Sequence, residues 1–156
     1  MGLLMRSLKG VASRFIVVVW CILLLGCKAF KSPEEAVDGL FSGLKECEQK
    51  KIKKSITKAS WKAIEELSLS VKAMLPEEKA KAFFPLQGIC DSVRNKTLEI
   101  GTSQAQGDKT VVEVALVDEK GKRARFIVPV VEEDGGWKVD WRGFWSLNFI
   151  EKEKGE

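Results

Sequence analysis

The spacing of the apolar residues changes from a helical period to alternation near Asn95, and this change constrains the fold more than any other feature. Before it, apolar residues recur three and four positions apart, as in amphipathic helices. After it, they alternate with charged residues, as in strands with one buried and one solvated face. Helices followed by consecutive strands predict the α+β class, with the N-terminal helices packed on one face of an antiparallel sheet of four or more strands.

The first helix has the clearest signals. Ser32 suits the N-cap, Pro33 suits the first helical position, and Glu35 completes a capping box. We expect the apolar side of this helix to pack against the sheet. Its residues have the spacing of one helix face: Val37, Leu40, Phe41 and Leu44.

The rest of the first half predicts further helices. The lysine-rich stretch 48–60 predicts a short helix, whose lysines either lie in solvent or contact anionic lipid headgroups. Ser60 is the predicted N-cap of the next helix, which ends before Pro76. A short helix to Phe84 is expected next, and residues 86–95, which have no clear period, are expected to form the crossing to the sheet. The apolar residues of the helix after Ser60 keep helical spacing: Trp61, Ile64, Leu67, Val71 and Leu75.

Four alternating stretches predict four strands. Hairpin turns are expected between them at 107–108, 118–121 and 133–136. The predicted buried faces are Leu98 and Ile100; Val112, Val114 and Leu116; Ala124, Phe126, Val128 and Val130; and Trp137, Val139 and Trp141.

Two details of these strands carry separate predictions. Pro129 has no amide hydrogen to donate, although its strand would lie inside the sheet, so we expect a bulge or a bend there. Glu113, Arg125 and Lys138 belong to the solvated face and are expected to pair across neighbouring strands.

The N-terminus has the order of an export leader. Three basic residues are followed by the unbroken apolar run 15–25, and then by Gly26 and Cys27. A helix of this length is about half as long as the hydrocarbon core is thick, so it does not span a bilayer stably.

Leu24-Leu25-Gly26-Cys27 resembles the lipobox of bacterial lipoproteins. The resemblance implies cleavage after Gly26, transfer of a diacylglyceryl group to Cys27, and acylation of its amine by a chain such as palmitate. Since Lys28 is not the aspartate that retains lipoproteins at the inner membrane, it also implies the cell envelope, at the periplasmic face of the outer membrane if there are two membranes. An ordinary secretory leader and an uncleaved anchor remain alternatives.

These predictions divide the chain into a signal peptide (1–26), a lipidated tether (27–31), one α+β domain (32–150) and a charged tail (151–156). After the leader, 23 basic and 22 acidic residues remain, a net charge of +1, which offers no case for nucleic acid as a partner. The main membrane contact is expected through the acylated Cys27.

Two cysteines of the expected domain, Cys47 and Cys90, are not used by the lipobox. In an oxidising envelope they could form a disulfide that closes a loop of about 43 residues. The alternative is two cysteines buried separately, because a sequence does not reveal the distance between two Cα atoms.

Several motifs of the domain resemble small bacterial lipoproteins with an uncharacterised domain of the nuclear transport factor 2-like superfamily, also called cystatin-like. They are Ser-Pro-Glu-Glu at 32–35, the lysine-rich short helix, Gly-Asp-Lys before Val-Val-Glu-Val at 107–114, and Gly-Gly-Trp-Lys-Val-Asp at 135–140. The resemblance covers about residues 31–142. It implies a cone-shaped fold with a curved sheet and a pocket between the sheet and the helices.

Enzymes of this superfamily include isomerases, dehydratases and polyketide cyclases, whose usual catalytic residues are His, Tyr and Asp. This chain has no His and no Tyr, so we assign no catalytic residue. Asp38, Glu99, Glu113 and Asp140 are conceivable bases, but their positions off the apolar stripe favour a solvated surface. Without His, a paired CxxC or a glycine-rich phosphate motif, no metal or cofactor is expected.

The expected function is therefore that of a non-enzymatic envelope lipoprotein that binds a partner protein or a small apolar ligand. An isomerase- or dehydratase-like enzyme with a single carboxylate in the pocket is the alternative. The apolar stretch 144–150 is expected either to form a final strand at the sheet edge or the cone mouth, or to bind a partner. The aromatic residues expected to line the pocket, or else to fill the core, are Phe41, Trp61, Phe126, Trp137 and Trp141.

Overall fold

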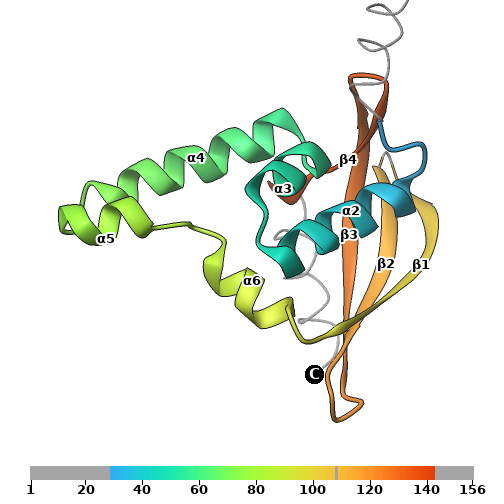
Figure 1. The fold of residues 1–156 in the computed structure, drawn as a ribbon. Helices are drawn as coiled ribbons and strands as arrows, with labels where there is room; N and C mark the ends of the chain where they lie inside the picture. The colour runs from blue at the N-terminus through green and yellow to red at the C-terminus, as the bar shows by residue number, and fades with distance from the viewer. Residues whose placement is uncertain (1–28, 108, 143–156) are drawn as a thin grey trace, which may run out of the picture.

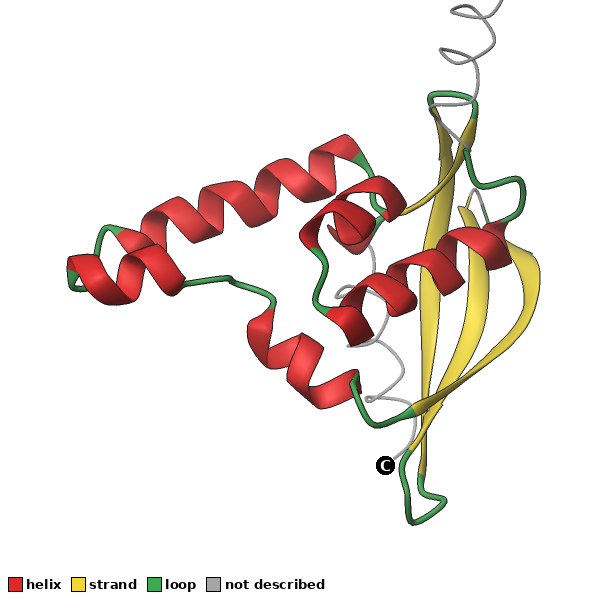
Figure 2. Ribbon diagram, viewed as in Figure 1, coloured by secondary structure: helices red, strands yellow, loops and turns green. Residues whose placement is uncertain are grey.

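The computed structural model describes residues 29–107 and 109–142, and its described part has the predicted α+β fold. Figures 1 and 2 show the helices on one side of the sheet, with α2 across it and α4 and α5 projecting away from it. The strands pair antiparallel in the order β1-β2-β3-β4. The elements are α2 (Pro33–Glu46), α3 (Gln49–Ser55), α4 (Lys58–Lys72), α5 (Glu77–Ala82), α6 (Gln87–Val93), β1 (Thr97–Gln106), β2 (Lys109–Val117), β3 (Arg123–Glu133) and β4 (Gly136–Val139).

Helix α2 begins as the sequence predicts. The hydroxyl of Ser32 accepts a hydrogen bond from the amide of Glu35 (3.2 Å), which confirms the N-cap. The carboxylate of Glu35 accepts from the amide of Lys31 (2.8 Å), one residue before the N-cap. The predicted apolar stripe is buried and α2 contacts all four strands, so this helix is the main cover of the sheet.

The boundary between α3 and α4 differs from the prediction. Helix α3 ends at Ser55, and the N-cap of α4 is Thr57, whose hydroxyl accepts from the amide of Ser60 (3.1 Å). Ser60 itself lies inside α4 and is buried, so its predicted role was wrong. The reason is tertiary, because Ile56 is buried and forms a parallel bridge with Val139 of β4, which requires extended backbone between the two helices.

The burial of α4 and the bounds of α5 and α6 also differ from the prediction. The apolar side of α4 is buried only at Ile64, and Leu67 is 56% exposed because the helix leaves the sheet. Helix α5 ends at Ala82, before the predicted end. Residues 87–93, predicted to be irregular, form α6, which buries Cys90 and Val93.

Pro129 lies in a regular part of the sheet, opposite Val111, so the predicted bulge at this residue was wrong. Its carbonyl accepts from the amide of Asp140 (2.9 Å). Because the N and C=O of one strand residue point to the same neighbour, the missing N–H of Pro129 faces the side where β4 ends at Val139. The register shift is instead in β1, between Ile100 and Ser103.

The solvated face of the sheet carries cross-strand ion pairs, one of them predicted. Arg125 lies 3.9 Å from Glu113, and an additional pair joins Arg123 to Glu99 (3.0 Å). Lys138, predicted to join the first pair, donates to the backbone carbonyl of Lys54 in α3 instead. The turn at 133–136 has positive φ angles at Asp134 (55°) and Gly135 (76°), as a two-residue hairpin requires.

Glu34 connects the start of α2 to the irregular part of β1. Its carboxylate accepts a hydrogen bond of 2.7 Å from the amide of Ser103. Its own backbone amide, followed by Ser103, lowers the pKa of this carboxyl from 4.5 to about 2. The charged form is therefore favoured in the folded chain.

This lowered pKa predicts a pH-dependent contribution to stability. The contribution is fully present above pH 4.5, the pKa in the unfolded chain, and is lost as the pH falls through about 2. We expect Glu34→Gln to lower the free energy of unfolding by about 1 kcal/mol at pH 7, because the group is partly solvated, and by much less at pH 2. Urea unfolding at both pH values measures the difference, with the exposed Glu78→Gln as the control. An equal loss at both pH values would contradict the prediction.

Candidate functional site

An apolar cavity of about 220 Å³ lies between α2, α6 and the helix-facing side of the sheet. Among the described residues that line it, Ser92 contributes a hydroxyl, Lys96 an ammonium group and Trp141 an indole N–H, and the other side chains are wholly apolar. A pocket with apolar walls and few polar groups is the usual form of a small-molecule site. The apolar lining residues are Leu40, Phe41 and Leu44 of α2; Ile89 and Val93 of α6; and Leu116, Phe126, Val128, Val139 and Trp141 from the sheet and its end.

A small polar cluster fixes the chain where it leaves β4 beside this cavity. The hydroxyl of Ser60 accepts from the amide of Trp141 (3.0 Å) and donates to the carboxylate of Asp140 (3.2 Å). The hydroxyls of Ser60 and Thr57 are 2.7 Å apart. These bonds connect the N-terminus of α4 to the end of the sheet. They also position Trp141, whose ring lines the cavity.

The structure separates the five predicted aromatic residues. Phe41, Phe126 and Trp141 line the apolar cavity, whereas Trp61 lies on α4 at other hollows. Trp137 packs against the core, and its amide donates to the carbonyl of Phe30 (3.0 Å). The structure therefore brings three of the five together.

The contribution of α6 was missed. Ile89, Ser92 and Val93 lie on this helix and Lys96 follows it, in a segment predicted to be irregular. A signal was present, because the apolar residues Leu86, Cys90 and Val93 have the spacing of one helix face. Residues 86–95 were interpreted as a crossing because three apolar positions in so short a segment do not establish a clear period.

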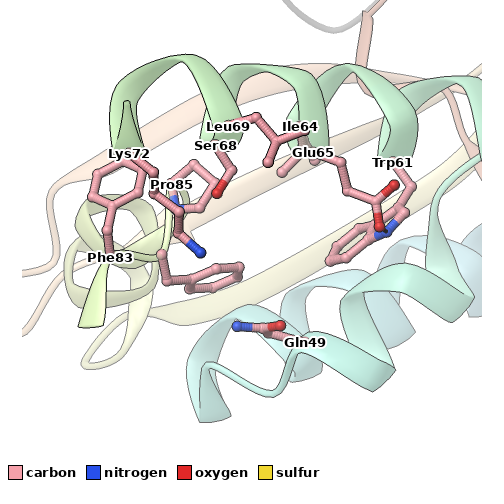
Figure 3. Close-up of a pocket in the computed structure, with 10 residues that line it drawn as sticks. Gln49, Trp61, Ile64, Glu65, Ser68, Leu69, Lys72, Phe83 and Pro85 are labelled. Carbon is pink, nitrogen blue, oxygen red and sulfur yellow. Dashed lines mark hydrogen bonds between the residues drawn. The ribbon is translucent and has the colours of Figure 1, made fainter. Parts of the chain in front are cut away.

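A second hollow, of about 380 Å³, lies between α4 and the segment 83–85. Figure 3 shows Glu65 beside Trp61 at one end of this hollow, and Lys72 near Phe83 at the other end. The indole of Trp61 donates to the carboxylate of Glu65, and the ammonium of Lys53 lies 5.3 Å from the centre of the Trp61 ring. Its lining is more polar than that of the apolar cavity, and its carboxylate is already engaged by these neighbours.

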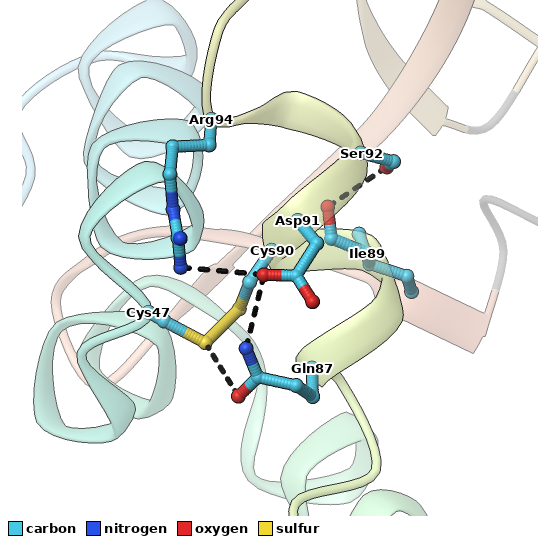
Figure 4. Close-up of a disulfide and its surroundings, with 7 residues drawn as sticks. All are labelled: Cys47, Gln87, Ile89, Cys90, Asp91, Ser92 and Arg94. Atoms are coloured by element: carbon cyan, nitrogen blue, oxygen red, sulfur yellow. Dashed lines mark hydrogen bonds and ion pairs between the residues drawn. A yellow bond between two sulfur atoms is a disulfide. The ribbon is translucent and has the colours of Figure 1, made fainter.

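A disulfide joins Cys47 to Cys90, so the two elements that line the apolar cavity from the helix side are connected covalently. Cys47 follows the last turn of α2 in the left-handed region (φ 53°), Cys90 is fully buried in α6, and their Cα atoms are 5.4 Å apart. Figure 4 shows Gln87, Asp91 and Arg94 around the bridge. Gln87 donates to Asp91 (3.1 Å), and Arg94 lies 3.3 Å from the same carboxylate.

The four carboxylates considered as bases lie elsewhere. Asp38 is exposed on α2, Glu99 and Glu113 pair with arginines on the solvated face, and Asp140 accepts from Ser60 and from the amide of Arg142. None of the four is among the described residues that line the apolar cavity. The described residues also contain no group of three His, Cys, Asp or Glu side chains placed to hold a metal ion.

The start of the described chain is packed firmly on the domain. The ring of Phe30 lies so close to Gly39 that a Cβ there would approach it to 2.5 Å. The ammonium groups of Lys54 and Lys138 lie 5.6 and 6.0 Å from the centre of the same ring. Together with the bond from Trp137, these contacts fix the backbone three residues after Cys27.

Three predictions fall on residues that the structure does not describe. They concern Gly26 and Cys27 at the lipobox and the apolar stretch 144–150. Within the described ranges, no helix combines the length and the apolar character that crossing a membrane requires.

In a comparison with known protein families, residues 26–140 of the chain match a family described as a domain of unknown function (DUF4878). The chain belongs to this family. The match includes all the described helices and strands, so the DUF4878 domain here is the α+β unit that contains the apolar cavity. Neither the curated proteins nor the solved structures contain a significant match to the chain.

Proposed function

We propose that this DUF4878 protein is a lipid-anchored, non-enzymatic envelope protein that binds a small apolar molecule between its helices and its sheet. The observation that carries the proposal is the cavity of about 220 Å³ whose walls are apolar side chains from α2, α6 and the sheet. Water in such a hollow contacts apolar side chains that a bound apolar molecule would cover. Burying that apolar surface is favourable by about 25 cal/mol for each Å².

The packing of Phe30 supports anchoring close to the membrane. Residues 27–30 reach at most about 10 Å when extended, so a lipid on Cys27 holds the domain within about that distance of the headgroups. Two or three acyl chains make such an anchor nearly permanent. The cavity is then close to a phase in which apolar molecules concentrate.

The order of elements supports a cone-shaped domain of the nuclear transport factor 2-like superfamily. Helices precede an antiparallel meander, and α2 lies across the face of the sheet. Enzymes of that superfamily use a pocket in the same place, between the sheet and the helices. In this chain, the described residues that line the cavity offer apolar side chains, one hydroxyl, one ammonium group and one indole N–H, a set that suits the binding of a small apolar molecule.

Filling the cavity tests the proposal. Ser92 lines the cavity but is exposed, so a tryptophan there is expected to enter the space without overpacking the core. Photoreactive octan-1-ol, added to membranes that contain the full-length protein, is expected to label lining residues. Ser92→Trp is expected to reduce this labelling at least about tenfold, a loss of about 1.4 kcal/mol in binding.

Ser70→Trp is the matched control. Ser70 is also an exposed helical serine, and its hydroxyl donates to the carbonyl of Glu66 (3.0 Å), as that of Ser92 does to Ile89 (2.8 Å). Labelling of this variant should equal that of the wild type. If the probe does not label the lining residues of the wild type, or if both tryptophan variants label normally, the proposed function is wrong.

A further inference from the structure

Lys96 is the one charged residue among the described residues that line the apolar cavity. It is half-buried, and no described carboxylate lies within ion-pair distance of its ammonium group. We propose, on the basis of the proposed function, that the cavity takes an amphiphile with a short apolar chain and an anionic head group, and that Lys96 binds the head group.

The local backbone holds Lys96 beside the cavity. Its amide donates to the carbonyl of Val93 (3.1 Å), which continues the turn at the end of α6. Ser92 is four residues earlier and also lines the cavity, so the two polar side chains lie together at its α6 wall. The ammonium of Lys96 can donate to an oxygen of the head group, whereas the hydroxyl of Ser92 already donates to the carbonyl of Ile89 (2.8 Å).

The acidic residue of α6 does not compete for this ammonium. The carboxylate of Asp91 accepts from the side chain of Gln87 (3.1 Å) and lies 3.3 Å from the guanidinium of Arg94. These contacts hold it beside the disulfide (Figure 4). The ammonium group of Lys96 can therefore pair with an anion that does not belong to the described residues.

The volume limits the apolar part of the ligand. A water molecule occupies about 30 Å³ in the liquid, and we take a carbon atom with its hydrogens to need a similar volume. On that basis, 220 Å³ accommodates about seven carbon atoms. An amphiphile of about eight carbons, with its head group at Lys96, fits this space. A long acyl chain of a membrane lipid does not fit completely.

An ion pair partly shielded from water discriminates well between charged and neutral head groups. A hydrogen bond to a charged group is about twice as strong as a neutral one, and a carboxylate is expected to gain about tenfold in affinity over a hydroxyl of the same chain length. The discrimination depends on the ammonium group and should disappear with it.

The experiment compares two photoreactive probes, octanoic acid and octan-1-ol, on the full-length protein in its own membranes. The readout is the ratio of acid to alcohol labelling at the lining residues, divided by the ratio at exposed sites, which removes differences in partition. We expect a ratio of about ten for the wild type. Lys96→Met should bring it close to one while keeping the labelling by the alcohol, and Lys79→Met, which changes an exposed lysine of α5, should leave it at about ten.

The outcomes separate this inference from the proposed function. If the alcohol labels the cavity and the acid does so no better, or if Lys96→Met keeps the wild-type ratio, the anionic head group is wrong and the apolar site stands. If neither probe labels the cavity, the proposed function fails, and the inference fails with it.

Discussion

Replacing Cys47 and Cys90 together by alanine is expected to lower the free energy of unfolding by about 3 to 4 kcal/mol, the value for a loop of the 43 residues that separate them. The physical reason is the larger conformational entropy of the unfolded chain without the bridge. For a domain of this size the melting temperature should fall by about 10 to 15 °C. Urea unfolding followed by tryptophan fluorescence measures the change.

The location of the bridge adds a local effect. Helix α6 has only seven residues and no side-chain N-cap, so it is marginal by itself. The bridge to the end of α2 is its covalent support, and α6 forms one wall of the apolar cavity. We therefore expect the cysteine variant to lose labelling by photoreactive octan-1-ol at temperatures where it is still folded.

Ser70→Ala, at an exposed serine of α4 away from the bridge and the apolar cavity, is the control and should change the unfolding free energy by less than about 0.5 kcal/mol. Reduction of the wild-type protein by a thiol should reproduce the loss seen in the variant. A double variant that unfolds within about 1 kcal/mol of the wild type would show that the bridge contributes little.

Cys27→Ser is expected to release the protein from the membrane. A serine hydroxyl cannot form the thioether that carries the diacylglyceryl group, and without the acyl chains no described helix can replace the anchor. A single acyl chain already gives measurable membrane binding, and each further acyl chain increases the affinity. Partition of the protein into the membrane should therefore fall at least about a thousandfold. Fractionation and mass spectrometry of the extracted protein measure the location and the modification.

Cys21→Ser, within the apolar run of the leader, is the matched control and should leave anchoring unchanged. The result also separates the three interpretations of the leader. A Cys27→Ser chain that stays in the membrane would favour an uncleaved anchor. A wild-type chain recovered unmodified in the soluble fraction would favour an ordinary secretory leader.

Local patterns were sufficient wherever one element carried its own signals. The N-cap at Ser32, the buried stripe of α2 and the alternation of the strands predicted the α+β fold and three of the residues that line the cavity. These features follow from helix and strand periods and from hydrogen bonds within a few residues, which a sequence displays directly.

The predictions were wrong where a residue's conformation or burial depends on segments far apart in the sequence. Ile56 is extended because Val139, more than eighty residues later, pairs with it. Pro129 fits a regular strand because β4 ends beside it. Leu67 is exposed because α4 leaves the sheet, although its spacing resembles that of a core residue.

The sequence by itself determined the fold class and supplied two cysteines for a bridge, because both depend on residue type and spacing along the chain. On the same basis it predicts a lipid anchor at Cys27. Only the tertiary structure decided that α6 closes one side of an apolar cavity, that the bridge holds it there, and that Lys96 faces that space without a described acidic partner. The physical reason is that a cavity is defined by what distant elements leave unfilled between them, and no single segment contains that information.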